Sequence, residues 1–349
     1  MAVIENLRPA LLSPDAVPPA VAGGEGLSSA RVAQGPCELI LESHHHGRHL
    51  GVVTTQEAAR VVEAYVRRFR HHQDRYDYVC VFRNYGARAG ASQTHPHSQL
   101  FGLQVVPDDI SYEILGTRHY YNGTGRCLVC DVLRAERAAE PSRIVRLLGD
   151  PDGVGFMVFE PRASRLAFET WIVPTRHRHS FGALDLDRDA EELVLFGEAL
   201  NWTLGRMRVA LDDPHYNLVL KTSPAGDGSL GPAYHWHVVI EPRDMSTPAG
   251  FESATGIRLN VVPPEEAANW LRRRGNALLP QSGNIFQRLA ARPAEVIPLV
   301  AILERELAEG VADHNRWSAE EMQALVRASQ RAERFPYQWP DQTLGEPRL

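Results

Sequence analysis

The sequence lacks several features that would assign it to particular classes of protein. Among its 349 residues, no apolar run approaches the roughly 20 residues that a membrane-spanning helix needs. Its start has no basic segment followed by an apolar core, as a secretory signal would have. A formal net charge of −6 argues against nucleic-acid or membrane-surface partners, which usually require a basic excess. Only four cysteines are present, too few for a disulfide framework, so we expect a cytoplasmic protein.

The composition that remains is that of an ordinary globular protein. Hydrophobic residues make up 44% of the chain and charged residues 23%. A chain of this length can form two domains or one large fused one. Residues 1–37 contain prolines and glycines without sustained periodicity, so we expect an irregular lead-in there.

The most informative stretch is a glycine-rich loop between two apolar runs. The run Tyr78–Phe82 is rich in β-forming residues, and a second run at 100–106 is stopped by Pro107. This pattern predicts a strand, a loop and a second strand. Gly86 and Gly90 would let the backbone of the loop come close to a ligand. The loop is therefore a candidate binding element.

Three hydrogen-bonding side chains follow the loop on the second strand. Because alternate residues of a strand share a face, His95, His97 and Gln99 would point the same way. Their position beside a loop of small residues suits an anionic ligand such as a phosphate. A polar, solvated strand face is the alternative interpretation of an isolated His-X-His.

The His-X-His pattern occurs twice, which favours the ligand-binding interpretation. His235 and His237 stand in an apolar run, and another apolar run at 216–221 precedes a glycine-containing loop upstream of them. The same module therefore occurs twice in the chain. The copies differ at the third position, which is Gln99 in the first copy and Val239 in the second.

These motifs resemble those of the histidine triad superfamily and, within it, the galactose-1-phosphate uridylyltransferase family, which carries two such domains in one chain. The resemblance runs from about residue 38 to about residue 274. The stretches that carry it are Asn84-Tyr-Gly, His95-Pro-His-Ser-Gln99, residues 168–177 and residues 249–256.

The resemblance implies an α+β fold with two tandem histidine-triad-like domains, whose antiparallel sheets are flanked by helices, plus a helical C-terminal extension. We expect a catalytic first domain at 1–122, a second domain at 123–262 and the extension at 263–349. Helical patterns near 293–307 and 318–334 lie in this extension. The extension fits either a helical cap or a homodimer contact.

The resemblance also implies a reaction and its residues. Members of the family move a uridylyl group between UDP-glucose and galactose 1-phosphate through a covalent uridylyl-histidine, and by position His97 is the nucleophile. Imidazole suits this role because it is a good neutral nucleophile near neutral pH and leaves readily once protonated. Gln99 would donate a hydrogen bond to a phosphate oxygen without supplying a proton, which favours transfer over hydrolysis. Asn84 and Ser92 match positions that contact phosphate or nucleotide.

Two other functions stay open beside this reaction. A nucleotide-sugar or dinucleotide phosphorylase would use the same histidine with phosphate as the acceptor. A shortened, catalytically weak member of the family would only bind nucleotides.

Two thiols and two imidazoles predict a zinc site in the second half of the chain. Cys127 and Cys130 form a Cys-X-X-Cys, which by itself fits either zinc binding or redox chemistry. With His177 and His235 they would make a closed tetrahedral site. This is the ligand set that the resemblance implies for two-zinc members of the family.

The first half departs from the family pattern. The resemblance gives His46 and His95 the positions of zinc ligands, but the amino-terminal Cys-X-X-Cys that shares this metal in the family is not visible, and Cys37 is solitary. Either the first domain is shortened or the start of the chain was placed too far downstream, and a remnant of two imidazoles would bind zinc weakly. Some members also bind iron through a glutamate, matched here by Glu113, and three histidines. Lys221 replaces one of these histidines, and an ammonium group cannot take its role.

Overall fold

The computed structural model describes residues 2–7, 9–16, 32–224, 228–244 and 250–274. Contacts within the chain define a larger unit, Met1–Arg208 with Pro214–Arg273, and a smaller one, Val209–Asp213 with Arg274–Leu349. The larger unit contains the β-sheet. The helices predicted at 293–307 and 318–334 lie outside the described residues.

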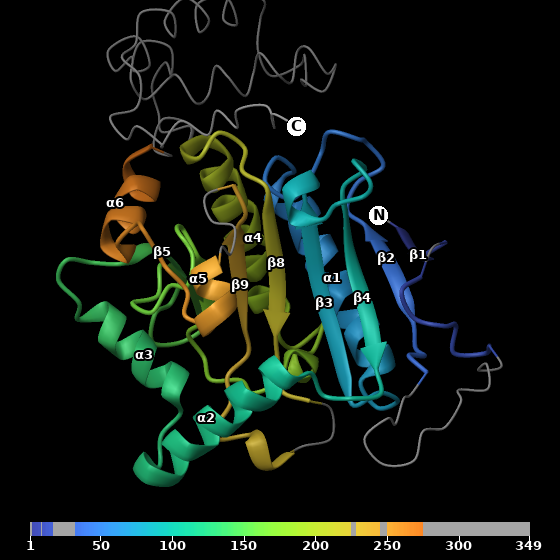
Figure 1. Cartoon of the computed structure of the whole chain (residues 1–349), viewed down its shortest axis with the longest axis horizontal. Helices are drawn as coiled ribbons and strands as arrows, with labels where there is room; N and C mark the ends of the chain where they lie inside the picture. The colour runs from blue at the N-terminus through green and yellow to red at the C-terminus, as the bar shows by residue number, and fades with distance from the viewer. Residues whose placement is uncertain (1, 8, 17–31, 225–227, 245–249, 275–349) are drawn as a thin grey trace, which may run out of the picture. The chain divides into compact units, whose positions relative to one another are not determined.

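One nine-stranded sheet forms the centre of the larger unit (Figure 1). Its strand order is β1-β2-β4-β3-β8-β9-β7-β6-β5, and every neighbouring pair is antiparallel. The strands are β1 (Ala2–Glu5), β2 (Cys37–Leu41), β3 (Tyr78–Tyr85), β4 (His97–Leu103), β5 (Ile144–Gly149), β6 (Gly155–Phe159), β7 (Thr170–Pro174), β8 (Tyr216–Lys221) and β9 (His237–Pro242).

The two copies of the repeated module meet in the middle of this sheet. Strands β3 and β4 come from the first copy and β8 and β9 from the second, and β3 pairs with β8 so that Asn84 lies opposite Asn217. The α+β class and the antiparallel sheets predicted from the sequence are therefore confirmed, with the two sheets joined edge to edge. The domain boundaries at 122 and 262 remain a prediction.

Helices cover both faces of the sheet. Those of the larger unit are α1 (Thr55–His72), α2 (Asp108–Thr124), α3 (Leu128–Arg137), α4 (Ala190–Ala210), α5 (Gly250–Thr255) and α6 (Pro264–Arg274). Helices α1 and α4 lie behind the strands, whereas α2 and α3 lie on the opposite side of the sheet (Figure 1). Phe181 packs between α1 and α4, with its ring centroid 5.6 Å from that of Phe69 on α1 and 6.1 Å from that of Phe196 on α4.

Local sequence signals set the start of α1. The predicted capping box is present: Glu57 N donates to Thr54 Oγ1 at 3.2 Å, and Thr54 N donates to Glu57 Oε2 at 2.8 Å. Two of the free N–H groups at the helix start are thereby satisfied. The helix then buries one apolar face against the sheet, including Val62, Val66 and Phe69.

The structure corrects two expectations about local structure and adds one helix that was not predicted. The sequence predicts an irregular segment at residues 2–5, but these residues form β1, an exposed edge strand whose only sheet partner is β2 in the described residues. The second strand of the first module begins at His97, so His95 lies in the loop before it. The 17-residue helix α2 has no clear sequence signal, because its buried Ile110 and Ile114 are mixed with exposed apolar side chains.

No helix in the described part of the chain has the length and apolarity to cross a lipid bilayer.

Candidate active site and metal centre

The predicted active-site residues gather where β4 begins. Gln99 pairs with Phe82 on β3, and paired residues of an antiparallel sheet point to the same face. His97, two residues before Gln99, and Asn84, two residues after Phe82, therefore share that face. This is the face opposite α1 and α4, where His97 is buried and Gln99 and Asn84 are half-buried beside the glycine-rich loop.

The loop between β3 and β4 needs glycine at two positions. Gly86 has φ +81° and Gly90 has φ +80°, and residues with a Cβ are strained in this region. A short 3₁₀ turn, Ala87–Ala89, lies between them. A Cβ on Gly86 would also stand only 1.6 Å from a ring carbon of His215. Both glycines are therefore required by the backbone path of the loop.

The hydrogen bonds of His97 leave one ring nitrogen available for chemistry. Its Nδ1 lies 2.8 Å from the backbone carbonyl oxygen of His95 and must donate to it, because a carbonyl only accepts. In the neutral ring this places the proton on Nδ1, and the lone pair of Nε2 is free. This is the tautomer that a nucleophilic imidazole needs.

Gln99 and Ser92 lie in different environments. The side chain of Gln99 is half-buried and has no hydrogen-bond partner within the described residues, so its amide is available to a ligand. Ser92 is exposed in the loop before β4, and in the described ranges it makes no hydrogen bond to His97 or Gln99. Its contact with phosphate or nucleotide stays a prediction.

A buried charged network that sequence reasoning missed supports the strand of His97 from behind. Arg83 Nε donates to Glu42 Oε1 at 2.7 Å, and Ser98 Oγ donates to the same oxygen at 2.7 Å. Burial opposes the charge on Arg83, but Glu42 raises the pKa of the guanidinium above its usual value. Ser98 lies between His97 and Gln99, so the network holds the backbone of both site residues. Isolated Arg and Glu residues 41 positions apart give no sequence signal of such a pair.

The first copy brings together the two imidazoles to which the resemblance assigns a metal. His46 Nδ1 and His95 Nδ1 lie 3.4 Å apart, and His95 Nε2 donates to the Ser43 carbonyl oxygen at 2.8 Å. The Nδ1 of His95 is therefore unprotonated in the neutral ring. His46 is exposed, so this pair has little protection from water.

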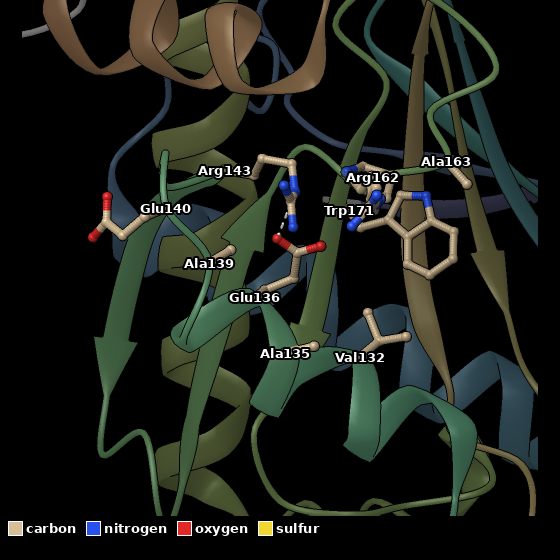
Figure 2. Close-up of a pocket in the computed structure, with 10 residues that line it drawn as sticks. Val132, Ala135, Glu136, Ala139, Glu140, Arg143, Arg162, Ala163 and Trp171 are labelled. Atoms are coloured by element: carbon tan, nitrogen blue, oxygen red, sulfur yellow. Dashed lines mark hydrogen bonds and ion pairs between the residues drawn. The ribbon is translucent and has the colours of Figure 1, made fainter.

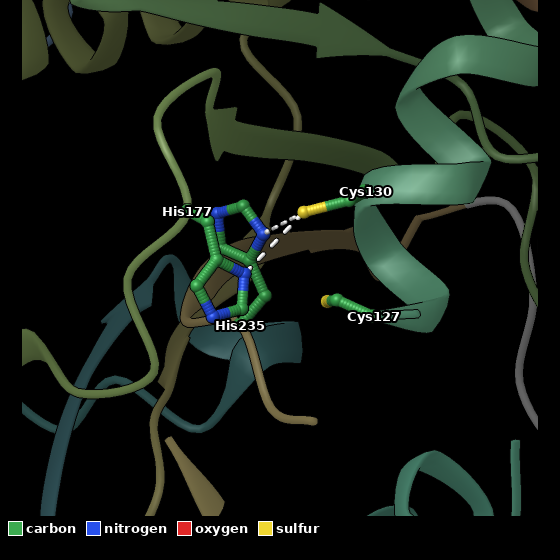
Figure 3. Close-up of side chains that lie close together, drawn as sticks. All are labelled: Cys127, Cys130, His177 and His235. Carbon is green, nitrogen blue, oxygen red and sulfur yellow. Dashed lines mark hydrogen bonds between the residues drawn. The ribbon is translucent and has the colours of Figure 1, made fainter. Parts of the chain in front are cut away.

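The second copy brings its four predicted ligands into one cluster (Figure 3). The ligand atoms of Cys127, Cys130, His177 and His235 all lie within 4.8 Å of one another. Cys130 Sγ is 3.3 Å from His177 Nδ1 and 3.5 Å from His235 Nδ1. In a tetrahedral zinc site, neighbouring ligand atoms lie about 3.3–3.8 Å apart. The cluster therefore fits a metal of this kind with little rearrangement.

The surroundings of the cluster prepare it for a cation. Cys127 is the N-cap of α3 and Cys130 lies in its first turn, where the helix dipole favours thiolates. Hydrogen bonds from Cys130 and from the two imidazoles lower the pKa of the Cys127 thiol. His177 Nε2 donates to the Gly231 carbonyl oxygen at 2.7 Å, which leaves Nδ1 free to bind a metal.

Comparison with known proteins identifies the family. A family model described as "Galactose-1-phosphate uridyl transferase, N-terminal domain" matches residues 12–107. The chain is 34% identical over 276 residues to the ADP-glucose phosphorylase of Arabidopsis thaliana, covering 77% of this chain and 73% of that protein. The chain belongs to the galactose-1-phosphate uridylyltransferase family. It is also 27% identical over 248 residues to the galactose-1-phosphate uridylyltransferase of Thermotoga maritima, covering 69% of this chain and 74% of that protein.

Solved structures of family members share the fold. The crystal structure of the Arabidopsis thaliana ADP-glucose phosphorylase with bound ADP-glucose superposes with a TM-score of 0.65 at 31% identity, covering 78% of this chain and 81% of that one. A structure described as a uridylyltransferase superposes with a TM-score of 0.68 at 25% identity, covering 80% and 85%.

Glu113 and Lys221, which the resemblance relates to an iron site, form an ion pair in this chain. Lys221 Nζ lies 3.3 Å from Glu113 Oε2, and Tyr234 OH donates to Glu113 Oε1 at 2.8 Å. Burial opposes ionisation of Glu113, but the charges of His237 and Lys221 lower its pKa below the usual value. The ammonium group thus supplies the positive charge that this carboxylate needs.

Replacement of Lys221 by methionine is expected to destabilise the protein by about 2 kcal/mol at pH 7, because a partly buried Glu113 carboxylate loses its cation. The pKa of Glu113 is lower in the folded protein than in the unfolded chain. The ionised carboxylate therefore stabilises the fold at pH values above the unfolded-state pKa, and this stabilisation is lost as pH falls through the folded-state pKa. The loss caused by Lys221→Met should therefore shrink in acid. Urea unfolding at pH 7 and pH 3.5 measures it, and the double variant with Glu113→Gln should recover stability. Equal stability of wild type and Lys221→Met at pH 7 would contradict the pairing.

A separate cavity lies in the second half of this family member (Figure 2). Its volume is about 450 Å³, with Trp171 on one wall and the Glu136–Arg143 ion pair, 2.8 Å long, on another. Its lining includes none of the predicted site residues. We therefore assign it no part in the reaction at His97.

Proposed function

We propose that this protein is a nucleotidyltransferase that takes a nucleoside monophosphate from a nucleotide sugar onto His97. The observation that carries the proposal is the tautomer of His97, whose Nδ1 donates to the His95 carbonyl oxygen and leaves Nε2 as the nucleophile. The available amide of Gln99 on the same strand face supports it.

The reaction has two displacements in which bonds and charges balance. The Nε2 of His97 forms a bond to the α-phosphorus while the bond from that phosphorus to the bridging oxygen breaks, releasing a sugar 1-phosphate. A phosphate oxygen of the acceptor then attacks the same phosphorus, and His97 leaves as a neutral imidazole. Gln99 and Asn84 donate hydrogen bonds to the phosphate oxygens, whose negative charge they stabilise during transfer.

Two acceptors define two candidate activities. The first is uridylyl transfer from UDP-glucose to galactose 1-phosphate, supported by the family and by the resemblance at His97 and Gln99. The second is phosphorolysis of ADP-glucose, in which inorganic phosphate is the acceptor. The 34% identity to an ADP-glucose phosphorylase over 77% of this chain favours the second.

Incubation with UDP-glucose or ADP-glucose labelled at the α-phosphate tests the proposal and separates the candidates. The expected result is one acid-labile label on protein, located at His97 by mass spectrometry. Galactose 1-phosphate should discharge a uridylyl label in the first candidate, and inorganic phosphate an adenylyl label in the second. No label from either donor, in protein that is folded and metal-loaded, would overturn the proposal.

We propose that the cluster of Cys127, Cys130, His177 and His235 holds zinc in a structural role. Four protein ligands would fill a tetrahedral shell, which leaves no position for substrate. His46 and His95 form a weaker candidate for a second zinc. The thiols are free in the described residues, which supports a reducing cytoplasmic setting. Homodimer formation stays a proposal that light scattering would test.

The third residue of the first module offers a further prediction. Gln99→His is expected to raise hydrolysis of the nucleotide sugar relative to transfer by roughly 10- to 100-fold, because it introduces a group able to act as general acid. The ratio of free nucleoside monophosphate to transfer product measures the effect within each variant. Gln99→Glu is the matched control of similar size. An unchanged ratio in Gln99→His, with both rates measurable, would show that this position does not set the reaction class.

A further inference from the structure

A chain of hydrogen bonds runs from the second copy of the module to Asn84 in the first. Arg243 Nε donates to Asn217 Oδ1. Asn217 Nδ2 donates to Asn84 Oδ1 at 2.9 Å and to the Ala89 carbonyl oxygen at 2.9 Å. Asn84 and Asn217 are direct cross-strand partners on β3 and β8. This series of hydrogen bonds therefore crosses the seam between the two copies, which is the pairing of β3 with β8.

The chemistry of these groups fixes the orientation of each amide. A guanidinium has only N–H donors, so the Asn217 atom that meets Arg243 must be the oxygen. The two N–H groups of Asn217 then point to Asn84 and to Ala89, and both find acceptors. Asn84 therefore receives a hydrogen bond at its oxygen, and its own Nδ2 is turned away from the seam.

The donor of Asn84 faces the glycine-rich loop. Its Nδ2 lies 3.8 Å from the point that a Cβ on Gly90 would occupy. The half-buried Asn84 offers this N–H group to no acceptor in the part of the chain that the structure describes. A half-buried amide donor beside a loop that allows close approach of a ligand suits an anionic oxygen.

Arg243, at the start of this series of hydrogen bonds, is itself held in place by an ion pair. Arg243 Nη2 donates to Glu241 Oε2 at 2.6 Å, and Glu241 Oε1 accepts from Arg165 Nη2 at 2.6 Å. Glu241 is the cross-strand partner of Asn217 on β9. Residues of the second copy thus set the donor and acceptor at each hydrogen bond of this series.

We propose that Asn217 and Arg243 are positioning residues of the second copy that hold the Asn84 amide with its N–H donor toward the loop, where it binds a phosphate oxygen of the substrate. The inference rests on the proposed function, in which a nucleotide sugar occupies this loop. The second copy has Val239 where the first has Gln99, so it has no polar residue at the third position. Through Asn217 and Arg243 it would still take part in substrate recognition by the first copy.

Asn217→Asp tests the proposal because it replaces the donor by an oxygen of the same shape. In this variant the Asn84 amide would turn to donate to the new carboxylate and would present its oxygen to the loop. Binding of the nucleotide sugar is expected to weaken about 10- to 100-fold, the effect of losing one hydrogen bond to a charged group. Calorimetry with UDP-glucose and ADP-glucose on metal-loaded protein carrying His97→Ala, which prevents turnover, measures this loss.

A double-mutant cycle separates positioning from direct repulsion by the new carboxylate. In an Asn84→Ala background, Asn217→Asp should cause no further loss of binding. An equal loss with and without Asn84 would overturn the proposal. Arg243→Met, at a half-exposed position, frees the Asn217 amide to turn and should give a smaller loss of about 3- to 10-fold, also absent without Asn84.

A ligand-free measurement distinguishes failure of this proposal from failure of the proposed function. If wild type binds neither nucleotide sugar, the proposed function fails. The orientation of the Asn84 side-chain amide is then tested by NMR, from its amide signals in protein labelled with ¹⁵N-asparagine. These signals, identified by their absence in Asn84→Ala, should shift in Asn217→Asp and in Arg243→Met. Unchanged signals in both variants would overturn the positioning role.

Discussion

Replacement of His97 by alanine is expected to abolish the labelled nucleotidyl-protein and to reduce turnover on the order of 10⁶-fold, to background. In the proposed intermediate the side chain supplies the only covalent bond between the protein and the phosphorus, so no neighbouring group restores the two-step reaction. Removal of its hydrogen bond to the His95 carbonyl should cost little stability, because that oxygen can accept from water. Labelling with both nucleotide sugars and a steady-state assay measure the effect.

The matched control is His237→Ala at the equivalent position of the second copy. Its Nδ1 makes the same hydrogen bond, to the His235 carbonyl oxygen at 3.0 Å, but the ring is buried and stacks on Trp171 at 4.6 Å. The neighbouring third position is Val239, which cannot bind a phosphate. His237→Ala should therefore lower the melting temperature and leave the adduct at His97 intact. Equal labelling of both histidines in wild type would contradict this division of labour.

Replacement of Cys130 by serine is expected to remove about one zinc per chain and to lower the free energy of unfolding by several kcal/mol. Cys130 Sγ lies within 3.5 Å of both imidazole ligands, so its loss removes one corner of the tetrahedron. The cluster joins α3, the loop after β7 and the segment just before β9, which come together only when the second copy folds. Elemental analysis and thermal unfolding measure the two effects.

Cys80→Ser is the control for loss of a thiol outside the cluster. Cys80 lies on β3 in the first copy, and this variant should keep its zinc. Full retention of zinc in Cys130→Ser would show that the cluster does not hold it. Equal zinc loss in both variants would place the metal elsewhere.

Local signals were sufficient to predict the strands and the loop of the repeated module. The run Tyr78–Phe82, the glycines of the loop and His97 predicted a strand, a turn and a strand, and the structure confirms β3, the loop and β4. The capping box of Thr54 and Glu57 predicted the start of α1 for the same reason. In each case the decisive interactions join residues close in sequence, so the residue types alone specify them.

Weak local signals explain the elements that were missed. All four residues of β1 are exposed, so no alternation of apolar and polar residues marks them as a strand. Their conformation depends on pairing with β2, more than 30 residues away. Helix α2 begins after Pro107 with two aspartates, yet its apolar residues do not form a single stripe, and only its packing against the sheet defines a buried side.

The sequence by itself determined the family and gave the candidate nucleophile and the candidate metal ligands, because these depend on residue chemistry and short spacings. Only the tertiary structure decided how the copies cooperate. Pairing of β3 with β8 places Asn217 against Asn84, and folding buries Arg83 on Glu42 behind His97. These contacts join residues 133 and 41 positions apart. Hydrogen bonds of that kind depend on distance and direction in space, which no local pattern records.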